Sequence, residues 1–207
     1  LPYDSAADFT PVIALVQSSH VLVVESRNPA KSVQDLIAAA RARPGEVNYG
    51  SFGVGSTVHL NTEEFGTLAG FRSTHVPYKG GADVLRAVVA GDIQFAITGL
   101  TPAQPLVKQG RLRILAYTGT RRLPELPDVP TMIEAGVPGY EVDGWYGLLG
   151  PAGLPPAIVR RLNEDLGAIV GIADIKDKLL AAGVTARAST PGEFREVIVR
   201  EDRKSTR

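Results

Sequence analysis

Short strands alternate with helices over the middle of the chain, and this order restricts the fold more than any other sequence feature. Apolar, β-branched runs are each followed by a helix-like segment, and glycines close several of these segments. This alternation with short connections is typical of an α/β protein with a mostly parallel sheet and right-handed crossovers. The predicted strands are 47–51, 72–76, 93–98 and 112–118, and the predicted helices between them are 56–68, 81–90 and 103–109.

Two further runs precede this unit, at 12–16 and 21–24, and their β-branched composition predicts buried strands. A helix follows them. Ser32 is placed to cap it, and Asp35 stands three residues later at the spacing of a capping box. Pro44 and the glycine after it predict the end of this helix.

The rhythm changes near residue 119, where a proline-rich stretch allows only a short helix at 132–135. Beyond it the pattern predicts a strand near Trp145, a short strand at 185–188 and three helices. From this shift we expect two lobes, one formed by residues 25–118 and the other by residues 1–24 together with 119–207. Two crossings between lobes suit hinge closure around a ligand. The three helices are predicted at 155–170, 174–182 and 191–200.

Composition excludes several classes of function. Lys and Arg together number 22, as do Asp and Glu, so the formal net charge is zero and no basic stripe indicates a nucleic-acid partner. There is no cysteine, which excludes disulfides, thiol catalysis and cysteine metal sites. No apolar run of about 18 residues predicts a membrane span, and no signal segment opens the chain.

The stretch NYGSFGVGSTVHL, residues 48–60, joins a predicted strand to a predicted helix through a glycine turn. It is not a dinucleotide fingerprint, because Val58 stands where the third glycine belongs, and no Lys-Ser/Thr pair follows as in a phosphate loop. Hydroxyl groups beside a helix N-terminus suit an anion such as a carboxylate. The alternative is that the serine at 56 simply caps the helix and the glycines only form the turn. The hydroxyl residues of this stretch are Ser51, Ser56 and Thr57.

Polar residues also follow the next two strands, with Tyr78 and Lys79 after one and Thr98 and Gly99 at the end of the other. In open α/β sheets, ligands bind beyond the carboxyl ends of the strands. Three such loops at one sheet edge therefore favour a ligand cleft, although Lys79 alone is typical of an ordinary surface lysine.

The histidines do not indicate a metal site, because no H-x-x-x-H or H-E-x-x-H spacing occurs. His59 falls in the first turn of a predicted helix, where a packing or capping role is the simplest interpretation. The G-x-S-x-G motif of serine hydrolases is absent. A Ser51–His59 catalytic pair stays open as an alternative, but no residue is indicated as its third member.

Several motifs in order resemble the solute receptors of tripartite tricarboxylate transporters, also called the Bug family. They are NYGSFGVGSTVHL, HVPYKGGADVLRAVVAGDIQFAI, GRLRILAYTGTRR and LPDVPTMIEAGVPGYEVDGWYGLLGPAGLPPAIVRRLN, and the resemblance runs from residue 1 to about residue 196. It implies a type II periplasmic binding-protein fold, α/β with two lobes, mostly parallel sheets and a ligand cleft between them. It also implies a periplasmic receptor, not an enzyme and without a cofactor or metal, that captures a small organic carboxylate for membrane permease subunits. The ligand-binding residues that it implies are Ser51, Gly53, Gly55, Ser56, Thr57, His59, Tyr78, Lys79, Thr98 and Gly99.

Two departures from the family pattern lead to further expectations. The family's N-terminal βαβ unit, with its glycine-rich loop, is not part of this chain, so we expect the first lobe to be incomplete. From this we expect either dimerisation through exposed apolar surface or weak ligand binding. Many relatives carry an aspartate where this chain has Thr98, which favours plain carboxylates over amino acids as ligands. Two alternatives stay open: a ligand-sensing domain of a transcription regulator, and a receptor that feeds a sensor kinase.

Overall fold

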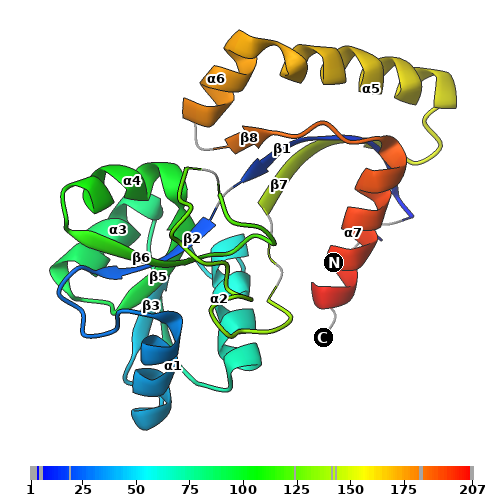
Figure 1. The fold of residues 1–207 in the computed structure, drawn as a ribbon. Coiled ribbons are helices and arrows are strands. Elements are labelled where there is room, and N and C mark those ends of the chain that lie inside the picture. Colours follow the sequence, from blue (N-terminus) through cyan, green and yellow to red (C-terminus); the bar gives the residue numbers. More distant parts are fainter. Residues whose placement is uncertain are drawn as a thin grey trace. The chain divides into compact units, whose positions relative to one another are not determined.

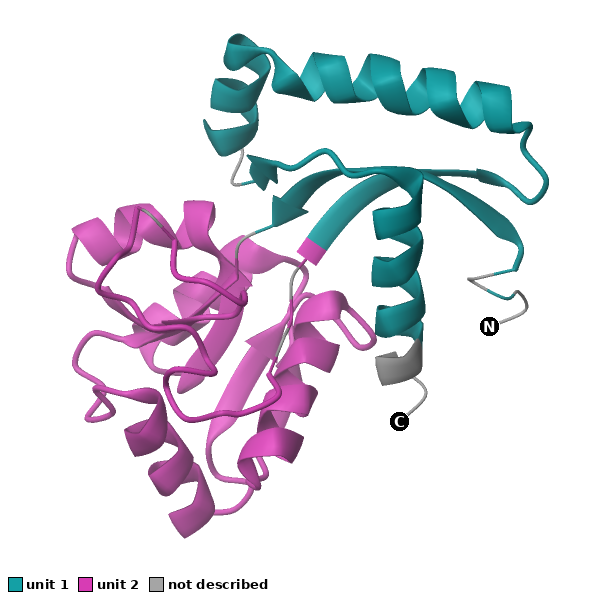
Figure 2. Ribbon diagram, turned by 45° about the vertical axis from the view of Figure 1, so that its right-hand side comes forward, with its two compact units in different colours: residues 1–18, 145–207 teal, residues 19–144 magenta. Residues whose placement is uncertain are grey.

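A computed structural model describes residue 4 and residues 7–18, 20–123, 125–140, 142, 144–181 and 184–205. The predicted end of a helix at residue 182 lies outside these residues. The chain divides into two compact units, shown in different colours in Figure 2. Unit 1 combines residues 1–18 with 145–207, and unit 2 comprises residues 19–144.

Unit 2 contains a five-stranded sheet in the order β4-β3-β5-β2-β6. β3 runs parallel to both β4 and β5, whereas β2 lies between β5 and β6 and is antiparallel to both. The sheet is therefore mixed. No crossover helix connects β2 to either neighbour, so the rule that makes βαβ strands parallel does not apply to it. The strands are β2 (His20–Glu25), β3 (Asn48–Ser51), β4 (Thr74–Pro77), β5 (Phe95–Gly99) and β6 (Leu112–Tyr117).

Helices cover both faces of this sheet (Figure 1). Successive side chains of a strand point to opposite faces, and β2 shows the result. Leu22 and Val24 join a core cluster with α1 and α2, while Val21 and Val23 join a second cluster with α3 and α4. The helices of unit 2 are α1 (Val33–Ala42), α2 (Thr57–Ala69), α3 (Gly81–Ala90) and α4 (Leu100–Lys108).

The capping box predicted for α1 is confirmed. The Ser32 side chain accepts a hydrogen bond from the backbone N–H of Asp35, and the Asp35 carboxylate accepts one from the backbone N–H of Ser32. These bonds satisfy N–H groups that no helical carbonyl can reach. α1 ends at Ala42, just before the predicted proline stop.

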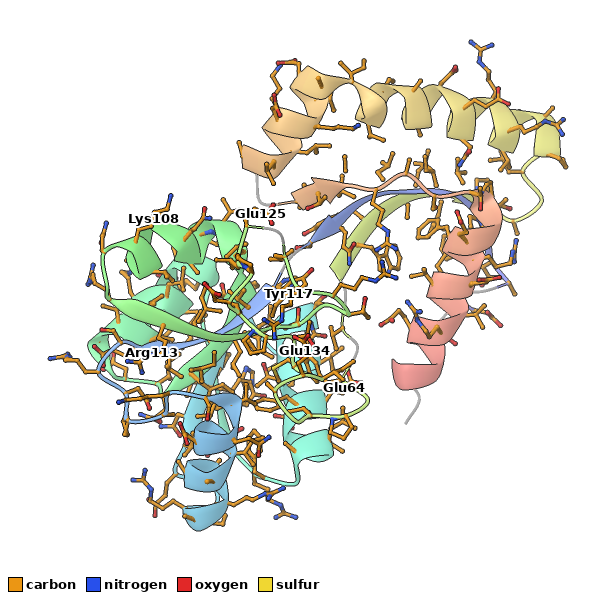
Figure 3. The ribbon with its side chains drawn as sticks, in the orientation of Figure 1. Glu64, Lys108, Arg113, Tyr117, Glu125 and Glu134 are labelled. Carbon is orange, nitrogen blue, oxygen red and sulfur yellow. The ribbon has the colours of Figure 1, made fainter. Side chains whose placement is uncertain are left out.

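The proline-rich segment after β6 belongs to unit 2 and packs against the α1/α2 core cluster through residues such as Met132 and Tyr140. Met132 donates its N–H to the Tyr117 carbonyl, which joins the segment to the end of β6. The predicted helix at 132–135 is wrong, because these residues form turns after Thr131 bridges to Tyr117. Arg113, labelled with Tyr117 in Figure 3, donates hydrogen bonds to three carbonyls in the loop after β2.

Unit 1 contains a three-stranded antiparallel sheet in the order β7-β1-β8, not the parallel sheet expected for this lobe. The reason lies in its connections, since β1 and β8 come from opposite ends of the chain and no βαβ unit joins them. Asn163 ties α5 to the sheet by donating hydrogen bonds to the carbonyls of Val12 and Ser189. The elements of unit 1 are β1 (Phe9–Ser18), β7 (Gly144–Pro151), β8 (Val184–Ala186), α5 (Pro156–Gly171), α6 (Ala173–Ala181) and α7 (Pro191–Ser205).

The boundaries of the compact units differ from the sequence-based lobe boundaries at residues 24 and 118. β2 belongs to unit 2 because it pairs with β5 and β6, and residues 119–144 belong there because they pack on the same core. Among the described residues, no helix is both long and apolar enough to cross a membrane.

Candidate functional site

The three loops proposed from the sequence leave the sheet of unit 2 at one edge. β3, β4 and β5 run in the same direction, and the register places Ser51 opposite Pro77 and Gly50 opposite Ala96. Their carboxyl ends therefore lie side by side, and α2, α3 and α4 begin just beyond them. The parallel arrangement predicted for these three strands brings the candidate residues together at this edge.

The first loop, residues 52–56, turns sharply between β3 and α2. Gly53 and Gly55 have φ angles of 120° and 79°, a region that favours glycine. Ser56 donates a hydrogen bond to the Gly53 carbonyl (2.8 Å) and accepts one from the backbone N–H of His59 (3.3 Å). Ser56 is therefore the N-cap of α2, as the capping alternative proposed, and Thr57 follows as the first, exposed helical residue.

Ser51 is completely buried at the end of β3, and its hydroxyl lies 2.6 Å from Nε2 of His75 on β4. The same oxygen accepts the backbone N–H of Gly53 at 3.1 Å. His59 makes a different contact, because its Nδ1 accepts the N–H of Gly55 at 3.1 Å. The Ser51–His59 pair considered for a hydrolase is therefore not formed, because Ser51 contacts His75 and His59 contacts Gly55.

A stack of rings supports this loop. The rings of Tyr49, His75 and His59 lie against one another, with centroid distances of 5.0 Å from Tyr49 to His75, 4.1 Å from His75 to His59 and 6.4 Å from Tyr49 to His59. The Tyr49 hydroxyl donates a hydrogen bond to Glu63. Burial lowers the pKa of His75 and the nearby His59 lowers it further, whereas Glu63 opposes this shift. Burial together with Glu63 raises the pKa of the Tyr49 hydroxyl.

Sequence reasoning missed Tyr49, His75 and Glu63, the hydrogen-bond partner of Tyr49. One local signal was available. His59 and Glu63 are four residues apart and so share one face of α2. Tyr49 and His75 are directly opposite in parallel strands, but that register follows from the assembled sheet and is not visible in one sequence.

The second loop contains Tyr78 and Lys79. The backbone N–H of Tyr78 donates to the Ser51 carbonyl at 2.9 Å, and its ring packs against the α3/α4 core cluster beside Gly50. Burial and the nearby Asp92 raise the pKa of the Tyr78 hydroxyl. Lys79 is exposed. α3 begins after this loop, and its N-cap is Gly80, which makes no side-chain cap hydrogen bond.

The third loop begins with Thr98, which is completely buried at the end of β5. Its hydroxyl oxygen has no hydrogen-bond partner among the described residues. Gly99 follows as the N-cap of α4 and supplies no side chain to cap it. A buried polar group without a partner costs free energy, so an unsatisfied hydroxyl stands at the end of β5.

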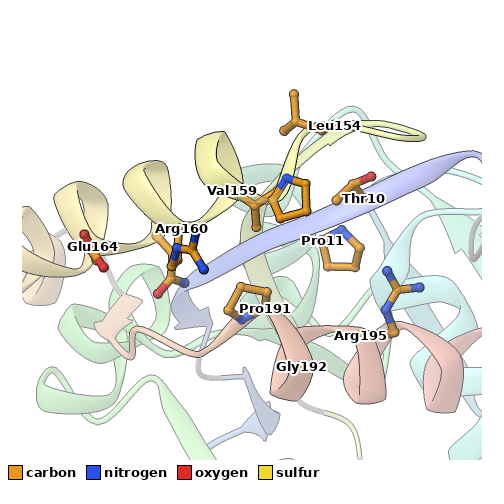
Figure 4. A pocket seen from close by; sticks show the side chains of 11 residues that line it. Thr10, Pro11, Leu154, Val159, Arg160, Glu164, Pro191, Gly192 and Arg195 are labelled. Carbon is orange, nitrogen blue, oxygen red and sulfur yellow. The ribbon is translucent and has the colours of Figure 1, made fainter.

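Two cavities lie elsewhere. One, of about 440 Å³, lies in unit 1 between β1, α5 and the start of α7, and Figure 4 shows Arg160, Arg195 and Pro11 around it. The other, of about 290 Å³, lies beside the start of α1. Neither is lined by a predicted site residue. Within the described residues, no group of three or more His, Asp or Glu side chains is placed to hold a metal.

Comparison with known proteins gives a consistent result. The whole chain, residues 1–207, matches the family described as "Tripartite tricarboxylate transporter family receptor". A protein from the tcbD-tcbE intergenic region of Pseudomonas sp. (strain P51) is 33% identical over 192 residues, which cover 92% of this chain and 57% of the relative. The chain thus spans little more than half the length of this curated relative.

Two solved structures share the fold. An R. palustris protein solved with adipate is 39% identical with a TM-score of 0.81, and the match covers 99% of this chain and 70% of that one. MatC from Rhodopseudomonas palustris, solved with bound malate, is 27% identical with a TM-score of 0.82, and the match covers 99% of this chain and 71% of MatC. The fold of the chain is therefore that of the α/β receptors of this family.

Proposed function

Because this chain belongs to the tripartite tricarboxylate transporter receptor family, we propose that it captures a small organic carboxylate and releases it chemically unchanged. The family is one of binding proteins and not of enzymes. The buried Ser51 fits this role, since its hydroxyl is used inside the loop by His75 and Gly53.

The observation that carries the proposal is the unpartnered hydroxyl of Thr98 beside helix N-termini that lack side-chain caps. N-terminal N–H groups carry partial positive charge and point away from the helix, where they can hold a carboxylate. In our proposal one ligand oxygen accepts a hydrogen bond from the Thr98 hydroxyl, and the loops after β3, β4 and β5 supply backbone N–H donors. The ten residues predicted from the sequence are the proposed contact set.

We propose a dicarboxylate of about the size of malate or adipate as ligand, because relatives were solved with these two acids. The neutral hydroxyl of Thr98 offers no negative charge to an ammonium group, so a plain diacid such as succinate is expected to bind better than aspartate. A competition titration in which aspartate displaced succinate at equal concentration would contradict this preference.

We further propose that the receptor works in the periplasm and delivers its ligand to membrane permease subunits. The family assignment supports both points. Co-purification of the receptor with its permease in the presence of ligand tests the partner, and fractionation of cells tests the compartment.

Replacing the Thr98 hydroxyl tests the site directly. Thr98→Val keeps the shape of the side chain, so the free energy of unfolding is expected to stay level or rise, since an unpaired buried hydroxyl is removed. The dissociation constant for adipate, measured by calorimetry, is expected to rise about fivefold to tenfold, as for one lost hydrogen bond of about 1 kcal/mol.

Thr62→Val is the matched control. Thr62 is equally buried, but its hydroxyl already donates to the Val58 carbonyl within α2, so its loss is expected to leave the adipate affinity unchanged. If Thr98→Val binds adipate as tightly as the unmodified chain, the hydroxyl is not a ligand contact and the proposal loses its main support.

A further inference from the structure

His75 lies at the centre of the contacts that stabilise the first loop, residues 52–56, which we call the glycine loop. Its Nε2 is 2.6 Å from the Ser51 hydroxyl, which accepts the Gly53 N–H. Its ring supports that of His59, 4.1 Å away, and Nδ1 of His59 accepts the Gly55 N–H. The Gly55 N–H is therefore held by one imidazole of this pair, and the Gly53 N–H by a hydroxyl that contacts the other and also donates to the Gly53 carbonyl.

We infer that His75 is a positioning residue for the glycine loop, and that the loop keeps this shape only while His75 and His59 are uncharged. The effect on ligand affinity rests on the proposed function, whereas the effect on the loop itself does not.

Hydrogen-bond chemistry requires His59 to be uncharged. Nδ1 of His59 accepts the Gly55 N–H through a lone pair, and a protonated imidazole has no lone pair at either nitrogen. Protonation therefore turns this acceptor into a donor facing another donor. Two positive rings at 4.1 Å would also repel each other.

Among the described residues, the other titratable groups that face the pair are Tyr49 on β3 and Glu63 on α2. Glu63 favours a positive charge on His75, but it also accepts the Tyr49 hydroxyl. Burial and His59 act against the charge, and their combined effect lowers the pKa of His75. The electrostatics around His75 thus favour its neutral state.

The first test uses the chain without ligand. Amide and histidine-ring NMR signals are followed between about pH 5 and 8, the range in which histidine titrates. We expect the Gly53 and Gly55 amide signals to move with the same midpoints as the ring signals. In His59→Asn the side-chain amide oxygen replaces Nδ1 as an acceptor that cannot titrate, and the Gly55 signal should stay constant. Glycine amide signals that do not move while the rings titrate would overturn the inference.

The second test measures adipate affinity in two variants of His75. His75→Phe keeps a ring beneath His59 but loses the contact with Ser51, and is expected to weaken binding at least fivefold. His75→Gln offers a polar, uncharged side chain toward Ser51 and is expected to retain most of the affinity. Its affinity should also change less on acidification than that of the unmodified chain, with the titration of adipate itself common to both.

The possible outcomes separate the positioning role of His75 from the proposed ligand. Equal affinity of His75→Phe and the unmodified chain, with matching thermal unfolding, would overturn the positioning role. Affinity of the unmodified chain that rises on acidification relative to His75→Gln would also overturn it, because it would mean that a charged imidazole attracts the acid. If neither the unmodified chain nor either variant binds adipate, but the glycine amide signals still titrate with the histidine-ring signals, the inference about the loop stands and the proposed ligand is wrong.

Discussion

Individual residues of the glycine loop show how local chemistry determines the site. Gly53 and Gly55 have positive φ angles, and neither has a neighbour within 4 Å of the position that a Cβ atom would occupy. Glycine is therefore required here by backbone conformation and not by lack of space. Ser51 and Ser56 use their hydroxyls inside the loop, and the N–H groups of Gly53 and Gly55 are also donated there. The ligand contacts that we propose for this loop are therefore with its other backbone N–H groups.

Gly55→Val is expected to destabilise the chain by about 1–3 kcal/mol, because a β-branched residue is strained at positive φ. The strain should also shift the Gly55 amide away from His59 and weaken adipate binding. Denaturant unfolding and calorimetry measure the two effects.

Gly171→Val is the matched control at the end of α5, where φ is not positive. Apart from the neighbouring residues and the backbone of the helix itself, no atom lies within 4 Å of the position that its Cβ would occupy. It is expected to change the free energy of unfolding by less than about 0.5 kcal/mol. Equal effects of the two substitutions would contradict the argument from loop conformation.

Among the helices and strands, those with local signals could be predicted and those set by long-range pairing could not. α1 follows from Ser32 and Asp35 at its start, and α3 from glycines at both ends, with the predicted limits Gly81 and Ala90. The direction of β2 could not be predicted, since its partners β5 and β6 lie far along the chain. The same limit explains why His75 was missed, because its contacts with Ser51 and His59 exist only in the assembled sheet.

Ser32→Ala tests the contribution of the α1 cap. Loss of the hydrogen bond to the Asp35 N–H is expected to cost about 1 kcal/mol of unfolding free energy. Ser32→Asp preserves an acceptor at the N-cap and should retain most of the stability. Adipate affinity should not change in either variant. If Ser32→Ala and the unmodified chain unfold at the same denaturant concentration, this account of α1 is contradicted.

The two compact units differ in how completely they bury their apolar residues. In unit 2 both faces of the sheet pack against helices. In unit 1, β7 is an edge strand whose Tyr146 and Leu148 side chains are 63% and 37% exposed. They lie on one face of β7 by alternation, opposite Trp145, whose ring packs on Phe194. Exposed apolar patches of this kind favour association.

We therefore expect the chain to self-associate at micromolar concentration through this face of β7, as measured by light scattering after size-exclusion chromatography. Leu148→Lys places a charge in the patch and should shift the distribution toward monomer. Lys108→Glu, on an exposed stretch of α4 in unit 2, also changes a charge and should have no effect. A concentration-independent monomer of the unmodified chain would contradict the expectation.

The most direct test of the central claim is a crystal structure of this chain with adipate. We predict a carboxylate of adipate within hydrogen-bond distance of the Thr98 hydroxyl, with further bonds from backbone N–H groups of the loops after β3, β4 and β5. Adipate bound elsewhere, or these loops covered by side chains of the protein itself, would contradict the proposal that this sheet edge is the binding site.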